Sequence, residues 1–484
     1  MISNGQSISK VKLFVESFLV YGFGGIISKL IPLVMLPIVT RMMPSTDYFG
    51  ISDLSNTIVQ FGSSLAVMGM YDAMYRMFFE KEETEFKKNI CSTSLVFTII
   101  TSIIVFAFML LFRSTIARLF FGDRKYAYVV YLSAMATLVG ATNSIISAPT
   151  RMQNKRKLYL ITNTISPLIS YAFAIPMLLS GHYIIALPMA AVISGIAMET
   201  IFYILNRTWF EVKKFDLGLL KQLLVIAVPL LPNFLVYWVF NSSDKIMITN
   251  LINVGASGVY SVGSKLGHVS QLIYLAFAGG WQYFAFSTMK EKNQVESNSK
   301  VFEYLGIISF FFSVFVFALS KTVFKLLFTD DYALGYIVAP YLFMAPLMQM
   351  LFQVACNQFI VIKRTWPNMF ILTGGALINV LLNLLLIPRI GIEGAAIATL
   401  LGYLCSDIIC CIVLCKMGLM VIPSRFLIVS GITCIYIILW RFITLNSVVM
   451  SLILATLSGL LMIYLYKSEV KTILRAVSNS LRKA

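Results

Sequence analysis

The sequence has 484 residues, of which 59% are hydrophobic and only 12% are charged. Soluble domains carry about 25% charged residues, so the composition excludes a soluble globular protein and places most of the chain in lipid. A membrane helix needs roughly 20 apolar residues, which leaves room for about fourteen helices and for no sizeable soluble domain. The net charge of +17 comes from Lys and Arg in short loops between apolar segments, a pattern that sets membrane orientation and does not indicate nucleic-acid binding.

The apolar segments predict an all-α polytopic membrane protein. They are too long for the strands of a membrane barrel and do not alternate as such strands would. We expect about fourteen membrane-spanning segments, near 15–40, 49–73, 90–112, 126–148, 158–180, 183–205, 219–241, 254–286, 301–320, 335–361, 367–388, 392–415, 424–440 and 446–466.

The distribution of Lys and Arg predicts that both termini are cytoplasmic. With this orientation the inner loops and tails hold about 26 of these residues and the outer loops about 10. The loop with Arg113, Arg118, Arg124 and Lys125 runs against the rule, but the total favours this orientation.

The chain contains an internal repeat. A shift of 208 residues places Gly50 on Gly258, and the same offset continues through polar loop residues. Because each copy holds an even number of segments, we expect parallel repeats related by an axis along the membrane normal, with a site between them near the midplane. The expected parts are a first six-helix lobe (1–208), a second six-helix lobe (209–415), two extra membrane helices (416–466) and a basic cytoplasmic tail (467–484).

Three cations are candidates for a substrate-binding cavity. Lys29 lies in the middle of the first segment, and Lys265 lies well inside the eighth. A Lys near the bilayer centre costs about 2.5–3.5 kcal/mol, so it should face a cavity or a carboxylate. Arg76, at the inner end of the second segment, fits the same ring. The alternatives are snorkelling or a structural partner for the lysines, and an ordinary inner-side anchor for Arg76.

Acidic residues in the membrane segments are candidates for coupling to a proton or Na⁺. Asp72 and Glu199 lie within or at the edges of segments, as does Asp53. An intramembrane carboxylate binds a cation readily, but helix capping or pairing with a Lys is an equally ordinary role. We expect no resident cofactor and no metal site, because the seven Cys show no CxxC pair and no His partners at ligand spacing.

The seventh segment combines two prolines with a polar patch. Pro229 and Pro232 interrupt the apolar helix, and the patch that follows contains Trp238, Asn241 and the adjacent pair Asp244–Lys245. Asp244 is a candidate for a gate between the lobes, or for a helix cap at the start of a new helix. Trp238 and Asn241 suit contact with sugar, although a Trp near the interface is usually a belt residue.

The tenth segment carries a row of amides. Gln353 and Asn357 are four residues apart and share one helix face with Gln349. This arrangement indicates either a polar cavity or hydrogen bonds between helices.

Four stretches resemble one family. They are "LPIVTRMMPSTDYFGISDL", "VPLLPNFLVYWVFNSSDKIMI", "VGASGVYSVGSKL" and "NLLLIPRIGIEGAAIATLLGY". The chain is similar, over about its whole length, to the polysaccharide transport family of the multidrug/oligosaccharidyl-lipid/polysaccharide (MOP) superfamily, the flippases for lipid-linked O-antigen and capsule repeat units.

The resemblance implies a V-shaped transporter with six plus six plus two helices and a cavity lined by cations from helices one, two, seven and eight. It implies alternating access and a polyprenyl-diphosphate-linked glycan as substrate in the bacterial inner membrane. Membrane lipids and other polysaccharide-assembly membrane proteins are the expected partners.

Two alternatives stay open. A multidrug or lipid II exporter of the same superfamily is the first, although an acidic cavity would suit drug cations better than the basic residues found here. A membrane-embedded polymerase or ligase is the second. The outer loops are only about 3–15 residues long, and no Ser-His-Asp or paired-carboxylate arrangement is present, so we do not expect an enzyme.

Overall fold

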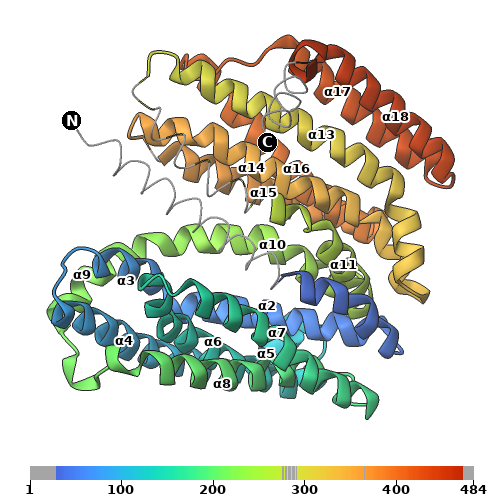
Figure 1. Ribbon diagram of the computed structural model, residues 1–484. Coiled ribbons are helices and arrows are strands. Elements are labelled where there is room, and N and C mark those ends of the chain that lie inside the picture. Colours follow the sequence, from blue (N-terminus) through green and yellow to red (C-terminus); the bar gives the residue numbers. More distant parts are fainter. Residues whose placement is uncertain are drawn as a thin grey trace. The chain divides into compact units, whose positions relative to one another are not determined.

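The computed structural model describes residues 29–471, except 275–276, 278–280, 282–284, 286–288, 290 and 365, and except the side chains of Arg156 and Asn233. Within these residues the chain is helical apart from short connections (Figure 1). It forms two compact units, which we call the first unit (1–262 with 382–395) and the second unit (263–381 with 396–484).

The first unit is built around α6. This helix packs against α2, α4 and α8, so it lies at the centre of the unit. The helices of the unit are α2 (Thr46–Val67), α3 (Met70–Phe78), α4 (Thr84–Leu111), α5 (Arg113–Phe121), α6 (Ala127–Met152), α7 (Arg156–Leu179), α8 (Ala186–Asn206), α9 (Leu217–Ala227) and α10 (Leu231–Leu251), followed by the start of α11 (Val254–Gly267).

The second unit is built around α13, which packs against α14, α17 and α18. Its helices are α13 (Gln294–Leu327), α14 (Ala339–Val361), most of α15 (Trp366–Ile390) and α16 (Ile392–Lys416), α17 (Ser424–Leu439) and α18 (Val448–Leu465). The helical fold predicted from the sequence is confirmed.

Ten helices among the described residues are long and apolar enough to cross a membrane, and α9 with α10 forms an eleventh if the bent pair counts as one span. Of the other three expected segments, 15–40 lies mostly outside the described residues, and 254–286 is only partly described. The segment near 49–73 is interrupted between α2 and α3.

Two breaks in the first unit follow from residue chemistry. Between α2 and α3, Met68 and Gly69 have φ values of 48° and 74°, which only Gly adopts without strain. A side chain at position 69 would also overlap the carbonyl oxygen of Ala227. Between α9 and α10 the axis bends by 44° at Pro229 and Pro232, because proline cannot continue the hydrogen bonding of a helix.

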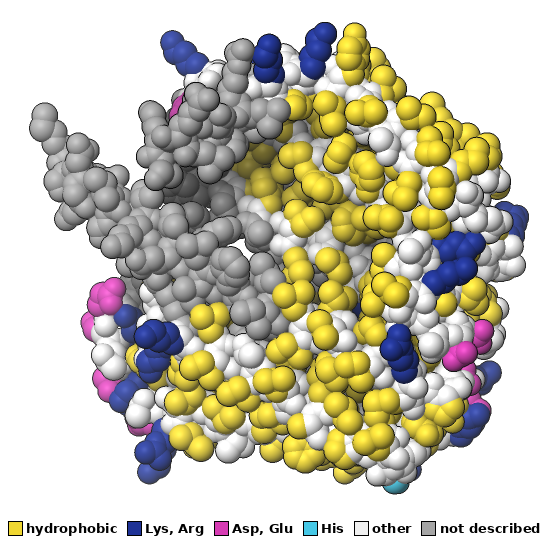
Figure 2. All heavy atoms as spheres, turned by 45° about the vertical axis from the view of Figure 1, so that its right-hand side comes forward, with side chains coloured by type: hydrophobic (Ala, Val, Ile, Leu, Met, Phe, Trp, Pro, Cys, Tyr) yellow, Lys and Arg dark blue, Asp and Glu magenta, His cyan; other side chains and the backbone are white. Residues whose placement is uncertain are grey.

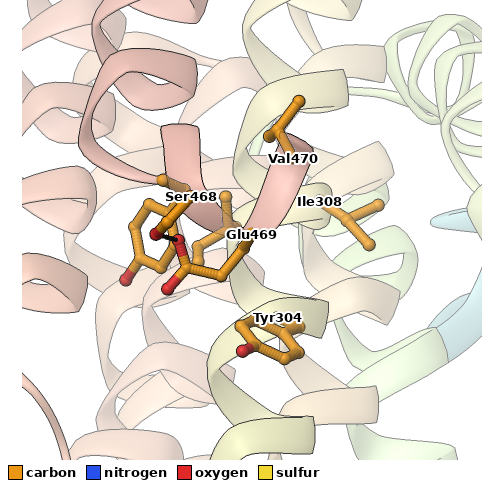
Figure 3. Close-up of a pocket in the computed structure, with 7 residues that line it drawn as sticks. Tyr304, Ile308, Ser468, Glu469 and Val470 are labelled. Carbon is orange, nitrogen blue, oxygen red and sulfur yellow. Dashed lines mark hydrogen bonds between the residues drawn. The ribbon is translucent and has the colours of Figure 1, made fainter. Parts of the chain in front are cut away.

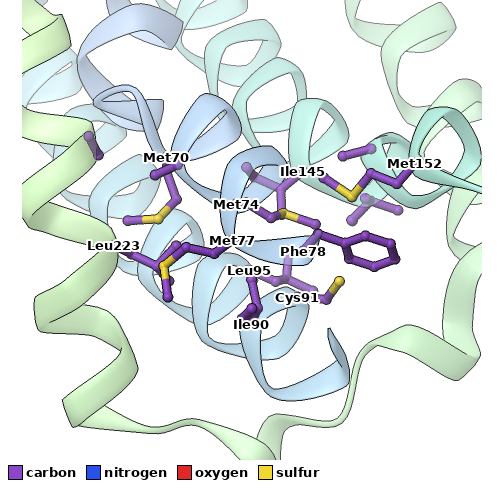
Figure 4. Packing of buried hydrophobic residues seen from close by; sticks show 14 of the residues in the cluster. Met70, Met74, Met77, Phe78, Ile90, Cys91, Leu95, Ile145, Met152 and Leu223 are labelled. Atoms are coloured by element: carbon purple, nitrogen blue, oxygen red, sulfur yellow. The ribbon is translucent and has the colours of Figure 1, made fainter. Parts of the chain in front are cut away.

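Hydrophobic residues fill the first unit at the end that holds α3. Met70, Met74 and Met77 project from one face of α3 into a cluster with Leu223 of α9 and Ile145 of α6 (Figure 4). Methionine suits such a contact because its flexible side chain fills irregular spaces between helices. This packing fixes which face of α3 is left exposed.

Helices α2 and α11 cross with their backbones in contact. A Cβ atom on Gly50 would overlap the carbonyl oxygen of Val254, and one on Gly258 would overlap that of Thr46. The repeat offset places Gly50 on Gly258 and Thr46 on Val254, so the two contacts are reciprocal. Reciprocal contacts are the signature of a twofold axis. The lobe boundaries at 208 and 415 stay a prediction.

The exposed surface fits a lipid environment. Hydrophobic side chains cover much of the visible described surface in Figure 2, and Lys and Arg side chains gather in separate patches. Exposed residues on α15, such as Leu377 and Leu381, and on α18, such as Leu457, are large and apolar. Contiguous apolar surface of this kind is rare on soluble proteins, so the chain is a multi-pass membrane protein.

Replacing Gly50 or Gly258 by Ala should destabilise the protein. Each methyl group would force the α2 and α11 backbones apart, at a cost of about 1–3 kcal/mol. We expect a lower midpoint of thermal unfolding for purified Gly50→Ala and Gly258→Ala than for wild type. Gly374→Ala in α15 is the matched control, because a Cβ atom there has no neighbour within 4 Å. Equal midpoints for all three variants would contradict the close crossing.

Candidate functional site

The exposed face of α3 combines aromatic rings with charges. Tyr71, Tyr75 and Phe79 follow one another at four-residue intervals, with ring centroids 6.2 Å and 5.5 Å apart. Tyr75 is 37% exposed and Phe79 is 53% exposed. Asp72 and Arg76, also four residues apart, are exposed on the neighbouring strip of the helix. We call these five residues the α3 face.

Arg151 extends the α3 face from the last turn of α6. Its guanidinium group donates a hydrogen bond of 2.9 Å to the hydroxyl of Tyr71 and lies 5.4 Å from the ring centroid of Tyr159. Arg151 also interacts electrostatically with Asp72. The α3 face, Arg151 and Tyr159 therefore combine two arginines, a carboxylate and four aromatic rings. This set suits a ligand that has both anionic and ring-shaped parts.

A buried ion pair joins α2 to α10. The ammonium group of Lys245 donates a hydrogen bond of 2.8 Å to the carboxylate of Asp53, and the two side chains are only 15% and 3% exposed. The pair connects positions 192 residues apart. Breaking such a pair leaves one charge buried without compensation, which costs about 3–5 kcal/mol. The role of Asp53 is therefore pairing with a lysine, one of the two ordinary roles considered above.

Asp244 lies inside α10 and not at its start, so the helix-cap interpretation was wrong. Its carboxylate accepts hydrogen bonds from the Tyr260 hydroxyl of α11 and from the Lys245 backbone N–H at 2.8 Å. Asp244 is only 4% exposed. It therefore ties α10 to α11 within the first unit, and its gate role stays a prediction.

The other polar residues of the seventh segment divide between packing and exposure. The ring of Trp238 packs against Phe61 with centroids 4.6 Å apart, and its N–H has no hydrogen-bond partner among the described residues. Asn241 is exposed and donates a hydrogen bond of 2.7 Å to the Tyr237 carbonyl. Contact of either residue with sugar stays a prediction.

The candidate cations do not form one described group. Lys29 is an exposed residue at the start of the described chain, and Arg76 belongs to the α3 face. Lys265 is exposed on α11 but belongs to the second unit. Glu199 is half-buried on α8 and lies close to the hydroxyl of Thr142 on α6. The shared cationic cavity and ion coupling therefore stay predictions.

The amides of α14 form hydrogen bonds between segments of the second unit. Tyr274 donates a hydrogen bond of 2.6 Å to Gln353, and Gln294 donates one of 3.0 Å to Gln358. Asn357 is buried on the same helix. Interhelical bonding, one of the two interpretations of this row, accounts for Gln353, and the cavity role of both residues stays a prediction.

A second ionic cluster fastens the last two helices to α13. The buried carboxylate of Glu303 accepts a hydrogen bond of 2.8 Å from Arg425 on α17 and one of 2.6 Å from the hydroxyl of Tyr466. Arg425 also pairs with Glu469. A pocket of about 540 Å³ lies beside this cluster, lined mainly by apolar groups from α13 and the segment after α18, including Tyr304, Ile308 and Val470 (Figure 3).

Charged loop residues form ordinary surface pairs. Lys214, in the connection before α9, donates a hydrogen bond of 2.6 Å to Glu85 at the start of α4, and this contact raises the pKa of Lys214. Asp123 accepts from the Lys125 backbone N–H at 2.9 Å, which lowers the pKa of Asp123. The Asp123 contact is therefore present at neutral pH and weakens only in acid, as pH falls through that lowered pKa.

The sequence reasoning missed three residues of interest. Arg151 falls between the expected segments 126–148 and 158–180 and so resembles an ordinary loop cation, while Glu303 and Asp407 lie inside the expected segments 301–320 and 392–415. Asp407 is the only acid between Glu393 and Glu469, so a systematic search of apolar segments for single acids would have found it.

The chain matches a known family over more than half its length. A family model described as "Polysaccharide biosynthesis protein" matches residues 14–290. The chain belongs to this family. No curated protein sequence matches the chain at a significant level.

Solved structures with the same fold are transporters. The chain is similar to the lipid II flippase MurJ in an inward closed conformation, with a TM-score of 0.67 and 16% identity over 95% of this chain and 99% of that one. It is also similar to the Vibrio cholerae MATE transporter VcmN, with a TM-score of 0.59 and 14% identity over 86% and 98% of the two chains. An inward-facing MATE multidrug transporter of the MOP superfamily gives a TM-score of 0.60 at 13% identity over 81% and 94%. The MOP fold predicted from the sequence is confirmed.

Neutralising only one member of the Asp53–Lys245 pair should be more harmful than neutralising both. We expect Asp53→Asn and Lys245→Met each to lower stability by about 3–5 kcal/mol, and the double variant to lose clearly less than the sum. Thermal unfolding of the purified proteins in a double-mutant cycle measures this coupling.

The control for this cycle is the surface pair of Glu296 and Lys300, joined by a 2.7 Å contact between side chains that are 67% and 55% exposed. Exposed pairs contribute little to stability, so Lys300→Met should leave the unfolding midpoint nearly unchanged. Additive losses at Asp53 and Lys245 would show that the two charges do not stabilise each other.

Proposed function

We propose that the protein is a flippase that moves a polyprenyl-diphosphate-linked oligosaccharide, an O-antigen, capsule or exopolysaccharide repeat unit, across the bacterial inner membrane by alternating access. Family membership and the transporter fold support the general class. The observation that carries the specific proposal is the α3 face with Arg151. Both chain termini are cytoplasmic in this proposal, and other membrane proteins of polysaccharide assembly are its partners.

The charges of the α3 face suit a diphosphate. Arginine presents a planar fork of N–H groups that forms paired hydrogen bonds with phosphate oxygens. Arg76 on α3 and Arg151 on α6 are both exposed, so both guanidinium groups are accessible to an anionic ligand. Sugars do not cross about 30 Å of hydrocarbon unaided, so the head group needs a polar path. Lys29 and Lys265 would add positive charge along that path.

The aromatic rings of the α3 face suit the glycan. The apolar C–H face of a pyranose ring packs on an aromatic ring, while its hydroxyl groups bond to charged and amide side chains. Tyr75 and Phe79 offer partly exposed rings, and Asp72 is an acceptor for sugar hydroxyls beside them. Trp238, Asn241, Gln353 and Asn357 are further candidates for glycan contact, and Asp244 for the gate.

The energy source belongs to the proposal as well. Asp72 and Glu199 are candidates for binding a proton or Na⁺ during the cycle, because both carboxylates lie on helices of the first unit with incomplete burial. A carboxylate that alternates between paired and solvated states changes its affinity for a cation.

A second candidate function is export of lipid II or of a drug. The similarity to a lipid II flippase over 95% of the chain favours the lipid II version, since lipid II also joins a glycan to a lipid through a diphosphate. The two exposed arginines favour an anionic cargo over drug cations.

In cells that lack this protein, lipid-linked repeat units should accumulate on the cytoplasmic leaflet. Leaflet-resolved labelling of the glycan with a membrane-impermeant oxidant measures this. Wild type should restore the outer pool, whereas the double variant Arg76→Ala/Arg151→Ala should restore it at a rate lower by about 100-fold or more, because each of the two arginines contributes a charged hydrogen bond of about 1.5–3 kcal/mol.

Lys300→Ala is the control for this experiment, because Lys300 is an exposed cation that pairs with Glu296, one turn earlier in its own helix. It should rescue fully. Full rescue by the double arginine variant would retain the flippase and discard the α3 face as its site. An unchanged leaflet distribution in the deletion strain would contradict the flippase and favour the exporter.

A further inference from the structure

Asp407 is a buried acid in the middle of a membrane helix. It lies in α16, 15 residues after the start of a helix that meets the criteria for a membrane span, which is roughly 22 Å along its axis. The side chain is only 5% exposed. A carboxyl group at such a position is expensive to retain, so it calls for an explanation in terms of function.

The carboxyl group lacks a hydrogen-bond partner among the described residues. Neither of its oxygen atoms has a hydrogen-bond partner in the part of the chain that the structure describes. The titratable groups within electrostatic range are thiols, from Cys356 on α14 and from Cys410 and Cys411 on α16 itself. No described Lys, Arg or His interacts with it. It differs in this respect from Asp53 and Glu303, each of which has a cation within 2.8 Å.

These surroundings favour a bound proton over a negative charge. Moving an ionised carboxylate into an apolar interior without a partner costs far more than protonating it. A hard metal cation would need several oxygen ligands, whereas the neighbouring groups are thiols, and no cluster of three His, Cys, Asp or Glu side chains suited to a metal occurs among the described residues. The chemistry of the site therefore fits H⁺.

We propose that Asp407 is a proton-binding site of the transport cycle, protonated while α16 is packed as observed and deprotonated when water reaches it. The role of this proton in a transport cycle rests on the proposed function, whereas the binding of the proton to Asp407 does not depend on the cargo. One proton is released as the O–H bond breaks, and the carboxylate is then hydrated. Asp407 is thus distinct from Asp72 and Glu199, which are less buried.

Proton release from Asp407 would make opening depend on pH. A carboxyl group in water loses its proton near pH 4. If the opened state exposes Asp407 to water while the packed state keeps the proton, then opening releases one proton. The equilibrium constant for opening then rises by about tenfold per pH unit at neutral pH. A fixed structural residue would give no such dependence.

Cys356 provides a reporter of opening, because its thiol is buried on α14 beside Asp407. We would replace the six other cysteines by Ala, reconstitute the full chain in lipid vesicles, and measure the rate of labelling by a membrane-permeant maleimide between pH 6 and 8. A variant that keeps only Cys91, a buried thiol of the first unit, corrects for the intrinsic reactivity of thiols. We expect the ratio of the Cys356 rate to the Cys91 rate to rise by about tenfold per pH unit.

Asp407→Asn in the Cys356-only background is the decisive variant, because it keeps the shape of the side chain and cannot titrate. Its rate ratio should not change with pH, while Asp407→Glu should keep the dependence. A ratio that is flat in the parent protein, or equally steep in Asp407→Asn, would overturn the proposal.

An independent measurement tests the proton itself. The infrared spectrum of the wild-type protein at neutral pH should contain the carbonyl band of a protonated carboxyl group that shifts in heavy water and disappears in Asp407→Asn. Identical spectra would show that Asp407 is ionised and would overturn the proposal. Neither experiment uses a glycan substrate, so failure of the flippase assay would leave both results interpretable.

Discussion

A charge in the hydrocarbon of a membrane is stable only beside an opposite charge or water, and the positions of this chain's charges follow from that constraint. Asp53 and Lys245 satisfy it by pairing with each other, and Glu303 satisfies it by pairing with Arg425. In both cases the pair also fastens helices together, α2 to α10 in the first unit and α13 to α17 in the second. Charges that lack a buried partner therefore indicate where function requires them.

The α3 face and Asp407 are two places, among the residues that the structure describes, where this requirement is not met by a buried pair. At the α3 face, Arg76 and Arg151 are exposed, so water or an anionic ligand must compensate them. At Asp407 the side chain is buried and a proton is the simplest compensation. An exposed cationic face suits a site that binds and releases cargo, and a buried acid suits a group whose charge changes with conformation.

The sequence predicted the fold class and the break at Pro229 and Pro232, because these depend on composition and on local rules for proline and apolar length. The family followed separately, from the resemblance of four stretches to its members. It could not predict the partner of Lys245, since Asp53 is 192 residues away and the two side chains meet only when α2 packs against α10. The break at Met68 was missed for a related reason. Gly69 is compatible with a break in the helix, but the approach of the Ala227 backbone to this glycine is a tertiary contact that the sequence does not show.

The expected segment near 49–73 consists of two helices, α2, which is anchored by its contacts, and α3, which exposes one face. Its first portion, α2, is held by the Asp53–Lys245 pair and by the backbone crossing at Gly50, so it has little freedom to move relative to α10 and α11. After the break at Met68 and Gly69, its second portion, α3, is held on one side by the methionine cluster and exposes the other side. A continuous helix would extend in the direction set by α2. The break instead lets the methionine cluster determine the direction of α3 and therefore the orientation of the α3 face. The strained backbone at Met68 therefore accompanies the change of direction that separates the anchored helix α2 from the exposed α3 face.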